Sequence, residues 1–358
     1  MKQKTLFPQF TYGTDAYEGI AEIMKPYGNK AVIVHGKKAY LAAKDKLLSA
    51  LEKDGVEVTG TVLYGHEATF ANVDLIVENE AVKEANVILA VGGGKCIDTC
   101  KCVSARLNKP IISIPTIASN CAPVTEIAIM YDGQGVYQDT VTISNGVLHT
   151  FIDTEIIADS PDQYFRAGIG DTLAKYVEAS FSARGDTLSY EDELGLKTAE
   201  LCFYPVIENG LIAIEAKKLH KPCEELTKTA LRIIVSTGVV SICVGQKYNT
   251  ALAHAMAYGF SCRSDVQDHH LHGDIVAYGV LIQELVDHQD ELFRREFEFH
   301  KKAGLPTKLS DLGLNNDDPL DDVLEIAVNN KGMEHIPYHV SREMIREAVK
   351  RLETMNND

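Results

Sequence analysis

Apolar positions along the first part of the chain fall into short runs rich in β-branched residues, which alternate with stretches of helical spacing. The strand-like runs are 31–36 (AVIVHG), 87–94 (VILAVGGG), 111–116 (IISIPT) and 126–131 (EIAIMY). Between them, residues 41–55 and 73–86 carry apolar side chains three and four positions apart, which predicts helices. This alternation predicts βαβ units and a parallel sheet with helices on both faces.

The pattern changes after residues 160–170 (SPDQYFRAGIG), beyond which strand-like runs are few. Long segments with apolar residues at helical spacing follow at 171–183, 191–218, 224–245 and 341–355. We therefore predict two domains with a boundary near Pro161: residues 1–160 form an α/β domain, and residues 161–358 form an all-helical domain. A chain of 358 residues is long enough to bury two such cores.

Composition narrows the classes of function. The formal net charge of −16 argues against nucleic acid or an anionic membrane as a partner, because both need clustered basic surface. No apolar run of membrane-spanning length is expected, and the N-terminal MKQKTLFPQFTYG lacks the apolar core of a secretory signal. The eight cysteines form no CxxC pair, which predicts free thiols in a reducing compartment. We expect a cytoplasmic protein.

The segment 92–101, GGGKCIDTCK, places three consecutive glycines between a strand and a helix. Backbone N–H groups at such a helix start can bind a phosphate, and no side chain obstructs its approach. We expect the glycines to receive the pyrophosphate of a dinucleotide, with Lys95 adding positive charge. The pattern is not GxGxxG, so a tight structural turn is the alternative. Asp98 in the first helical turn could equally be an acid that the helix dipole favours.

Three further segments carry groups that can bind a metal. Asp171 follows a glycine and is expected to begin a helix, His254 lies among small apolar residues, and three histidines fall within 269–272. One carboxylate and two imidazoles from separate helices are a common ligand set for catalytic zinc, with a fourth position open. The alternatives are an N-cap for Asp171 and a packed core histidine for His254. We expect His269 and His270 to face solvent without binding metal.

Together these segments resemble the iron-containing (group III) alcohol dehydrogenase family, and within it the glycerol dehydrogenase branch. The resemblance spans nearly the whole chain and rests on segments in the family's order: 92–101, 114–132, 167–179, 254–260, 270–279 and 304–314. It implies an α/β dinucleotide-binding domain and an all-helical metal- and substrate-binding domain with the active site in the cleft between them. This is the dehydroquinate synthase-like and glycerol dehydrogenase-like fold.

The resemblance also implies roles for single residues. Asp171, His254 and His272 match the family's metal ligands and would form the catalytic centre. NAD(P) would be held at matching positions of the first domain: Gly93, Gly94, Lys95, Thr116, Ser119, Thr125, Ile127 and Tyr131, with Asp98 in the same glycine-rich segment. The iron-dependent branch has a fourth ligand, a histidine, where this chain has Lys175. Three ligands with an open position fit Zn²⁺ better than Fe²⁺, although another divalent metal could serve.

The implied activity is hydride transfer between NAD(P) and a small alcohol or polyol such as glycerol, with the metal polarising the substrate oxygen. Two positions depart from the glycerol dehydrogenase pattern. Cys121 replaces an aspartate that lies beside the polyol, and a thiol accepts hydrogen bonds poorly. Gly36, followed by Lys37 and Lys38, replaces the aspartate that binds the ribose hydroxyls, which predicts that NADP(H) is accepted.

Several alternatives stay open from the sequence. A 2-hydroxycarboxylate dehydrogenase that reduces a 2-oxo acid also fits Cys121, which could otherwise be an inert small residue. Lys37 and Lys38 could be solvated surface charge, and the chain could be a non-catalytic nucleotide-binding protein. A dehydroquinate-synthase-like lyase is disfavoured because the helical half lacks the extra basic residues for its phosphate. The expected partners are a small alcohol or a hydroxy or oxo acid and, from the family, further copies of the chain in a homo-oligomer.

Overall fold

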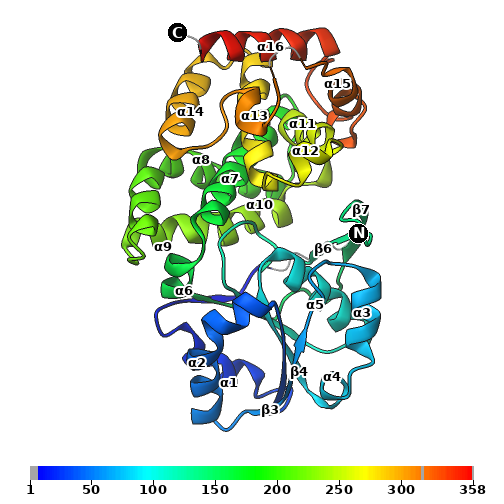
Figure 1. Cartoon of the computed structure of the whole chain (residues 1–358), viewed down its shortest axis with the longest axis vertical. Coiled ribbons are helices and arrows are strands. Elements are labelled where there is room, and N and C mark those ends of the chain that lie inside the picture. Colours follow the sequence, from blue (N-terminus) through cyan, green and yellow to red (C-terminus); the bar gives the residue numbers. More distant parts are fainter. Residues whose placement is uncertain (1–6, 316–317, 357–358) are drawn as a thin grey trace. The chain divides into compact units, whose positions relative to one another are not determined.

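A computed structural model describes residues 7–315 and 318–356 of the chain (Figure 1). Its contacts divide the chain into two compact units. Unit 1 runs up to Pro161 and takes in the short segment His220–Pro222, whereas unit 2 comprises Asp162–Leu219 and the chain from Cys223 onward. Within the described residues, every strand belongs to unit 1, and unit 2 is helical. The predicted fold class, an α/β region with a parallel sheet followed by a helical region, is confirmed.

Unit 1 is built on a six-stranded sheet in which all neighbouring strands are parallel. The strand order is β1-β8-β5-β4-β2-β3. The bounds are β1 Phe10–Gly13, β2 Lys30–His35, β3 Glu57–Leu63, β4 Val87–Gly92, β5 Ile111–Pro115 and β8 His149–Asp153. The helices are α1 Ile20–Met24, α2 Lys37–Lys53, α3 Phe70–Val77, α4 Glu80–Glu84, α5 Gly94–Leu107 and α6 Thr154–Asp159.

Alternate residues of the central strands enter two different cores. Val32 and Val34 of β2 pack in one cluster with residues of α3, α4 and α5. Ala31 and Ile33 pack in the other with residues of α1 and α2. A strand that is buried on both faces is apolar at consecutive positions, which is why β2 and β4 could be recognised in the sequence.

Two expectations for unit 1 are wrong in detail. Residues 126–131 form a strand, β6 (Ile127–Tyr131), but it pairs antiparallel with β7 (Tyr137–Thr142) in a separate two-stranded ribbon. The predicted helix 73–86 is two helices, because the side chain of Asn79 accepts a hydrogen bond from the Ala81 N–H and caps α4 as a new helix.

Unit 2 consists of helices that pack around α13, which contacts α7, α11, α14 and α16. The bounds are α7 Asp162–Ser182, α8 Tyr190–Lys218, α9 Glu224–Leu231, the π-helical turn η2 Arg232–Ser236, α10 Thr237–Cys243, α11 Leu252–Ser261, α12 Ser264–Gln267, α13 His272–Val286, α14 Asp290–Ala303, α15 Asp321–Val328 and α16 Arg342–Met355. The central helix α13 therefore contacts both α7 and α11, the helices that carry the other two candidate metal ligands.

One helical stretch contradicts the expectation that no run is long and apolar enough to span a membrane. Glu224–Cys243 qualifies by length and composition, with a mean hydropathy of 1.4. It comprises α9, η2 and α10, which pack against α8, and 56% of its apolar window is buried inside the protein. A stretch of this length that is mostly buried is also what a core helix of a folded domain looks like.

None of the eight cysteines, all of which lie within the described residues, forms a disulfide. Five are buried, Cys121 and Cys223 are partly buried, and Cys262 is exposed. Burial raises the pKa of the Cys102 thiol to about 11, so this thiol stays protonated at neutral pH. The buried cysteines thus behave as small apolar residues of the core.

Two glutamates are buried between α13 and α14. Glu284 and Glu296 are 1% and 0% exposed, and His300 Nε2 lies 3.2 Å from Glu296 Oε1. Burial raises the pKa of Glu284 well above its ordinary value, and the nearby Glu296 raises it further. Because the folded-state pKa is raised, the stability associated with protonated Glu284 is present in acid and is lost as the pH rises toward that pKa.

Replacing Glu284 with Gln should remove this loss while keeping the size of the side chain. We expect Glu284→Gln to unfold at nearly the same temperature as the parent at about pH 5 and at a higher temperature than the parent at about pH 8 to 9. Circular dichroism melts at several pH values measure the difference. Glu298→Gln, an exposed glutamate of α14, is the control and should show no such widening. A constant difference between Glu284→Gln and parent at every pH would contradict the interpretation.

Candidate functional site

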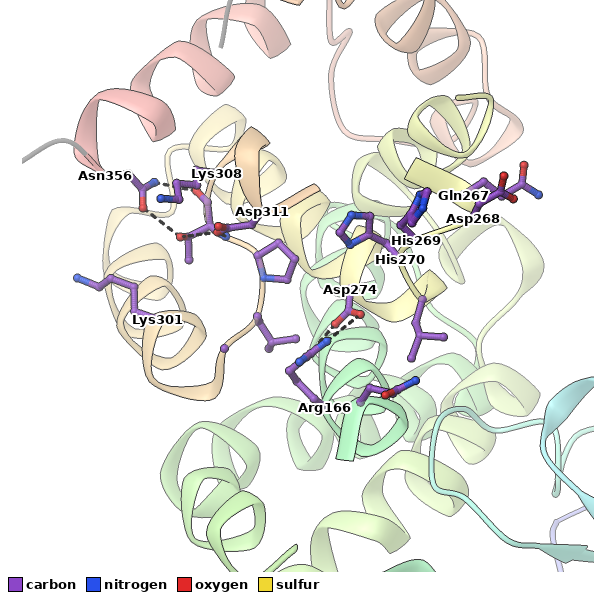
Figure 2. A pocket seen from close by; sticks show the side chains of 16 residues that line it. Arg166, Gln267, Asp268, His269, His270, Asp274, Lys301, Lys308, Asp311 and Asn356 are labelled. Carbon is purple, nitrogen blue, oxygen red and sulfur yellow. Dashed lines mark hydrogen bonds and ion pairs between the residues drawn. The ribbon is translucent and has the colours of Figure 1, made fainter. Parts of the chain in front are cut away.

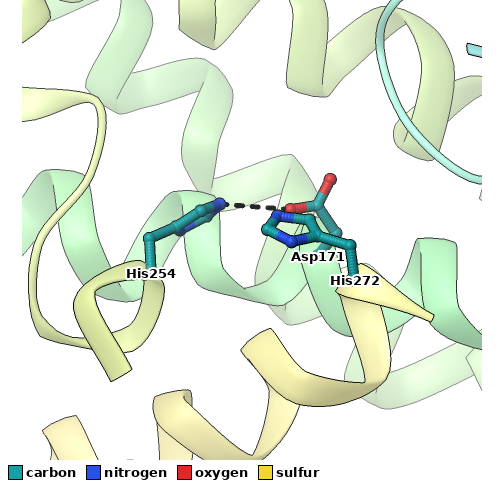
Figure 3. Close-up of side chains that lie close together, drawn as sticks. All are labelled: Asp171, His254 and His272. Atoms are coloured by element: carbon teal, nitrogen blue, oxygen red, sulfur yellow. Dashed lines mark ion pairs between the residues drawn. The ribbon is translucent and has the colours of Figure 1, made fainter. Parts of the chain in front are cut away.

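Three side chains from three helices of unit 2 converge (Figure 3): Asp171 of α7, His254 of α11 and His272 of α13. Each offers one ligand atom, and these atoms all lie within 4.8 Å of one another. His254 Nε2 lies 3.4 Å from Asp171 Oδ1, and the two imidazole centroids are 5.5 Å apart. Asp171 and His254 are buried while His272 is exposed, so the cluster is open to solvent at His272.

Direct backbone contact between α7 and α13 brings two of these residues together. A Cβ atom at Gly273 would lie 1.9 Å from the carbonyl oxygen of Ala167, and one at Gly170 would lie 2.5 Å from the carbonyl oxygen of Gly273. Both distances are far below van der Waals contact, so only glycine allows the two helices to cross this closely. Asp171 and His272 are the direct neighbours of these glycines, and the crossing places them side by side.

A third glycine has the same effect where α13 meets α11. A Cβ atom at Gly279 would lie 2.4 Å from the carbonyl oxygen of Ala253, which directly precedes His254. The backbone of α11 can therefore lie against α13. The three ligand-bearing helices are held at distances that larger residues would not permit.

Asp171 lies in the middle of a helix, contrary to the expectation that it begins one. The helix α7 starts at Asp162, so Asp171 is its tenth residue. Gly170 looked like a helix boundary because glycine is a poor helix former. For Gly170, the physical reason is the crossing with α13, which the sequence pattern of α7 alone does not reveal.

Glu178 of α7, which the sequence analysis did not single out, contacts His254 from the side opposite Asp171. Its side chain is fully buried, and Oε2 accepts a hydrogen bond of 2.5 Å from His254 Nδ1. A proton on Nδ1 makes Nε2 the nitrogen that faces Asp171 and that could bind a metal in exchange for its own proton. The sequence signal was the spacing: residues seven apart lie two turns apart on one face of a helix.

The electrostatics of the cluster favour a cation. Burial alone would lower the pKa of His254, but Glu178 and Asp171 outweigh it and raise this pKa to about 9. Burial alone would raise the pKa of Asp171, but the hydrogen bond and charge of His254 lower it to about 2. One carboxylate oxygen and two imidazole nitrogens are donors that suit Zn²⁺ and other borderline divalent metals. The residues present therefore fit such an ion.

In unit 1, the carboxyl ends of β2 and β4 form the predicted nucleotide-binding edge. The strand order reverses between these two strands, and parallel α/β sheets bind ligands at such a switch point. Gly36 follows β2 as the N-cap of α2, and Gly93 follows β4 as the N-cap of α5. The Gly36 N–H donates to the carbonyl oxygen of Val91 at 3.2 Å, so the two loops lie next to each other.

The glycines at the start of α5 also serve close packing. A Cβ atom at Gly93 would lie 2.7 Å from Ile117 Cδ1, and one at Gly94 would lie 2.7 Å from Asn120 Nδ2. The loop after β5 therefore lies directly against the start of α5. No described side chain caps this helix, so its first N–H groups have no side-chain partner and can meet an anion. The turn and the phosphate interpretations are both compatible with this geometry.

Lys95 and Asp98 point to different partners. Lys95 Nζ lies 2.6 Å from Glu67 Oε2 and 5.1 Å from the centroid of the Tyr131 ring. Asp98 is buried, and its carboxylate accepts hydrogen bonds from Lys101 Nζ at 3.0 Å and from the Ile129 N–H at 3.1 Å. The bond from Ile129 holds β6 against α5. Direct cofactor contact by Asp98 stays a prediction.

Lys101 completes this buried ion pair. Its ammonium group also donates to the carbonyl oxygen of Ile127 at 2.5 Å and to Thr125 Oγ1 at 3.4 Å. The other predicted positions are distributed as follows: Thr116 is buried directly after β5, Ser119 and Cys121 are partly buried in the loop that follows, and Lys37 is exposed in the first turn of α2. All of them belong to unit 1.

Comparison with known proteins places the chain near one family of oxidoreductases. Residues 8–148 match the family described as iron-containing alcohol dehydrogenase. The chain is 28% identical to hydroxycarboxylate dehydrogenase A of Escherichia coli, across 91% of this chain and 90% of that protein. It is also 28% identical to a glycerol dehydrogenase of Thermotoga maritima, across 97% and 95%. These matches make the chain similar to the iron-containing alcohol dehydrogenase family.

Solved structures share the fold of this chain. A probable glycerol dehydrogenase from Sinorhizobium meliloti superposes with a TM-score of 0.85 at 23% identity, across 99% of both chains. Glycerol dehydrogenase from Schizosaccharomyces pombe gives a TM-score of 0.86 at 23% identity, across 99% of this chain and 92% of that one. At these identities the likeness shows the fold alone.

Lys175 and the neighbouring histidines His269 and His270 supply no ligand to the cluster of Asp171, His254 and His272. Lys175, one turn after Asp171, donates from Nζ to Asn249 Oδ1 at 3.0 Å. His269 and His270 lie outside the cluster and line a separate cavity of about 940 Å³ (Figure 2). Among the described residues, Asp171, His254 and His272 are the one group of three that could hold a metal ion.

Adding a methyl group at Gly273 should force α7 and α13 apart. We expect Gly273→Ala to lower the free energy of unfolding by about 1–3 kcal/mol or more, as at other overpacked sites. We also expect it to weaken Zn²⁺ binding. Thermal unfolding and metal titration measure the two effects.

Gly245→Ala is the matched control, because a Cβ atom there would meet its nearest neighbour at an ordinary 3.6 Å. Unchanged Zn²⁺ affinity in Gly273→Ala would show that the close crossing does not position the ligands.

Proposed function

We propose that the protein is a metal-dependent oxidoreductase that transfers hydride between NAD(P) and a small alcohol or polyol, with glycerol-like substrates as the leading candidates. The observation that carries the proposal is the convergence of Asp171, His254 and His272 in a chain similar to this family. A bound divalent metal polarises the substrate oxygen and lowers the pKa of the alcohol. Asp171 and the two imidazoles bind this ion, and the exposed position of His272 leaves a side open to substrate.

The metal is Zn²⁺, with Fe²⁺ or another divalent ion as a substitute. Three protein ligands with an open position are the usual arrangement of catalytic zinc. Lys175 supports this choice because it occupies the position of the fourth ligand expected for iron and donates to Asn249 instead. Its positive charge also helps to lower the pKa of Asp171, which keeps that carboxylate ionised.

The cofactor is NAD(P), held at the switch point of unit 1 by the glycine-rich start of α5 and the loop after β5. NADP(H) is accepted because Lys37 and Lys38 are exposed in the first turn of α2. That first turn contains no acidic residue. Lysines and free N–H groups at a helix start attract a 2′-phosphate, whereas an acid there would repel it.

By the resemblance to glycerol dehydrogenases, Cys121 stands where those enzymes carry an aspartate beside the polyol. A 2-hydroxycarboxylate is the second candidate, because a thiol in place of an aspartate removes a negative charge that would repel the substrate carboxylate. The E. coli relative named as a hydroxycarboxylate dehydrogenase and the Thermotoga glycerol dehydrogenase are equally similar to this chain. A cytoplasmic homo-oligomer completes the proposal; the lack of disulfides among the described cysteines supports a reducing compartment.

A substrate panel tests the function. With Zn²⁺ present, we expect nicotinamide absorbance changes with glycerol and related alcohols or with 2-oxo acids, and loss of that signal after chelation. His272→Ala should reduce kcat by at least about a hundredfold, as expected when a transition-state interaction is lost, while cofactor binding measured by fluorescence stays intact.

His270→Ala is the matched control, since His270 lines the separate cavity and lies outside the cluster. Full activity of His272→Ala would refute the metal role, and activity confined to 2-oxo acids would favour the second candidate.

Cofactor choice gives an independent test. We expect the parent to use NADPH, and joint replacement of Lys37 and Lys38 by Ala to lower kcat/KM for NADPH about tenfold, equivalent to about 1.4 kcal/mol, with little effect on NADH. Lys44→Ala, further along α2, should change neither value. A large preference of the parent for NADH would count against the assignment of these lysines.

A further inference from the structure

We propose that Glu178 is a positioning residue that fixes the tautomer of His254 and thereby sets the metal affinity of the site. The inference rests on the proposed metal role of Asp171, His254 and His272. Glu178 itself offers no oxygen to the three-residue cluster; it acts through the histidine.

The His254 ring lies between two carboxylates of one helix. Nε2 faces Asp171 at 3.4 Å, and Nδ1 faces Glu178 at 2.5 Å. The two acids are seven positions apart, which places them on the same face of α7 about 10 Å apart along its axis. The imidazole therefore has a fixed orientation: one nitrogen is directed at the metal cluster and the other at a carboxylate that can only accept a proton.

The two carboxylate oxygens of Glu178 accept hydrogen bonds from different donors. Oε1 accepts hydrogen bonds from the backbone N–H groups of Ala251 at 2.7 Å and His254 at 2.8 Å. These groups lie at the start of α11, where no intrahelical acceptor is available to them. Oε2 bonds the ring nitrogen alone. One oxygen thus fixes the backbone of α11, and the other fixes the proton on Nδ1.

This division makes Glu178→Gln an informative substitution, because the amide has nearly the same shape. If its oxygen keeps the two backbone bonds, its NH₂ group faces Nδ1 and donates to it. Nδ1 must then be unprotonated, so the proton moves to Nε2, which can no longer bind a metal. The opposite amide orientation would set its NH₂ against two backbone N–H donors, which is the worse arrangement.

Gln283 of α13 provides a matched control. Its Oε1 accepts from the Ala253 N–H at 3.0 Å and its Nε2 donates to the Val177 carbonyl at 3.1 Å. Gln283 is equally buried and holds the same end of α11, but none of its hydrogen bonds reaches the His254 ring. Loss of Gln283 therefore perturbs the helix start without changing the tautomer.

The experiment titrates the full-length, metal-free protein with Zn²⁺ and Co²⁺, using calorimetry for affinity and the visible absorption of Co²⁺ for the ligand set. We expect Glu178→Gln to weaken Zn²⁺ binding by about 10- to 100-fold, the usual effect of losing a partner of a metal-binding histidine, and to shift the Co²⁺ spectrum. Gln283→Ala should lower the unfolding temperature but keep the parent spectrum. Glu178→Asp, which keeps a carboxylate as acceptor for Nδ1, should have the same Co²⁺ spectrum as the parent.

The outcomes distinguish a wrong role for Glu178 from a wrong proposed function. Parent-like affinity and spectrum in Glu178→Gln, while the parent binds both metals, would overturn the inference and leave the proposed function standing. If Glu178→Gln does not fold, Glu178→Asp decides: a spectrum unlike that of the parent contradicts the inference. A parent protein that binds neither metal would instead remove the proposed function.

Discussion

The candidate metal site depends on how closely three helices approach one another. The helices α7, α11 and α13 touch through backbone atoms at Gly170, Gly273 and Gly279, where any Cβ atom would lie inside van der Waals contact. Asp171, His272 and His254 lie directly beside these contacts in the chain. Because packed helices have interiors as dense as organic crystals, the ligand atoms are held by the whole core of unit 2. A local loop could not impose the same precision.

Much of the fold could be predicted from the sequence because buried parallel strands and amphipathic helices have different periods. The strands β2, β4 and β5 were recognisable as continuous apolar runs. The strand β6 was recognised too, but its antiparallel pairing with β7 depends on a partner whose residues are mostly exposed and polar. Pairing is a property of two segments, and the pattern of one segment does not determine it.

The candidate site was accessible to sequence reasoning in its ligands but less so in their support. Asp171, His254 and His272 have chemistry that spacing and family resemblance can identify. Gly170 was misread as a helix boundary because its packing role appears only when α13 is placed against it. Glu178 had a usable signal in its spacing from Asp171, yet its function becomes clear only from its hydrogen bonds to His254 and the start of α11.

The unequal burial of Asp171, His254 and His272 bears on how a metal ion would reach the candidate site. Asp171 and His254 form a buried pair that Glu178 keeps in place, whereas His272 is reached by solvent. An arriving ion can meet the exposed imidazole first and then settle on the two residues beneath it. Any exchange of an occupant with solvent would therefore pass His272, while the Asp171–His254 pair stays shielded from solvent.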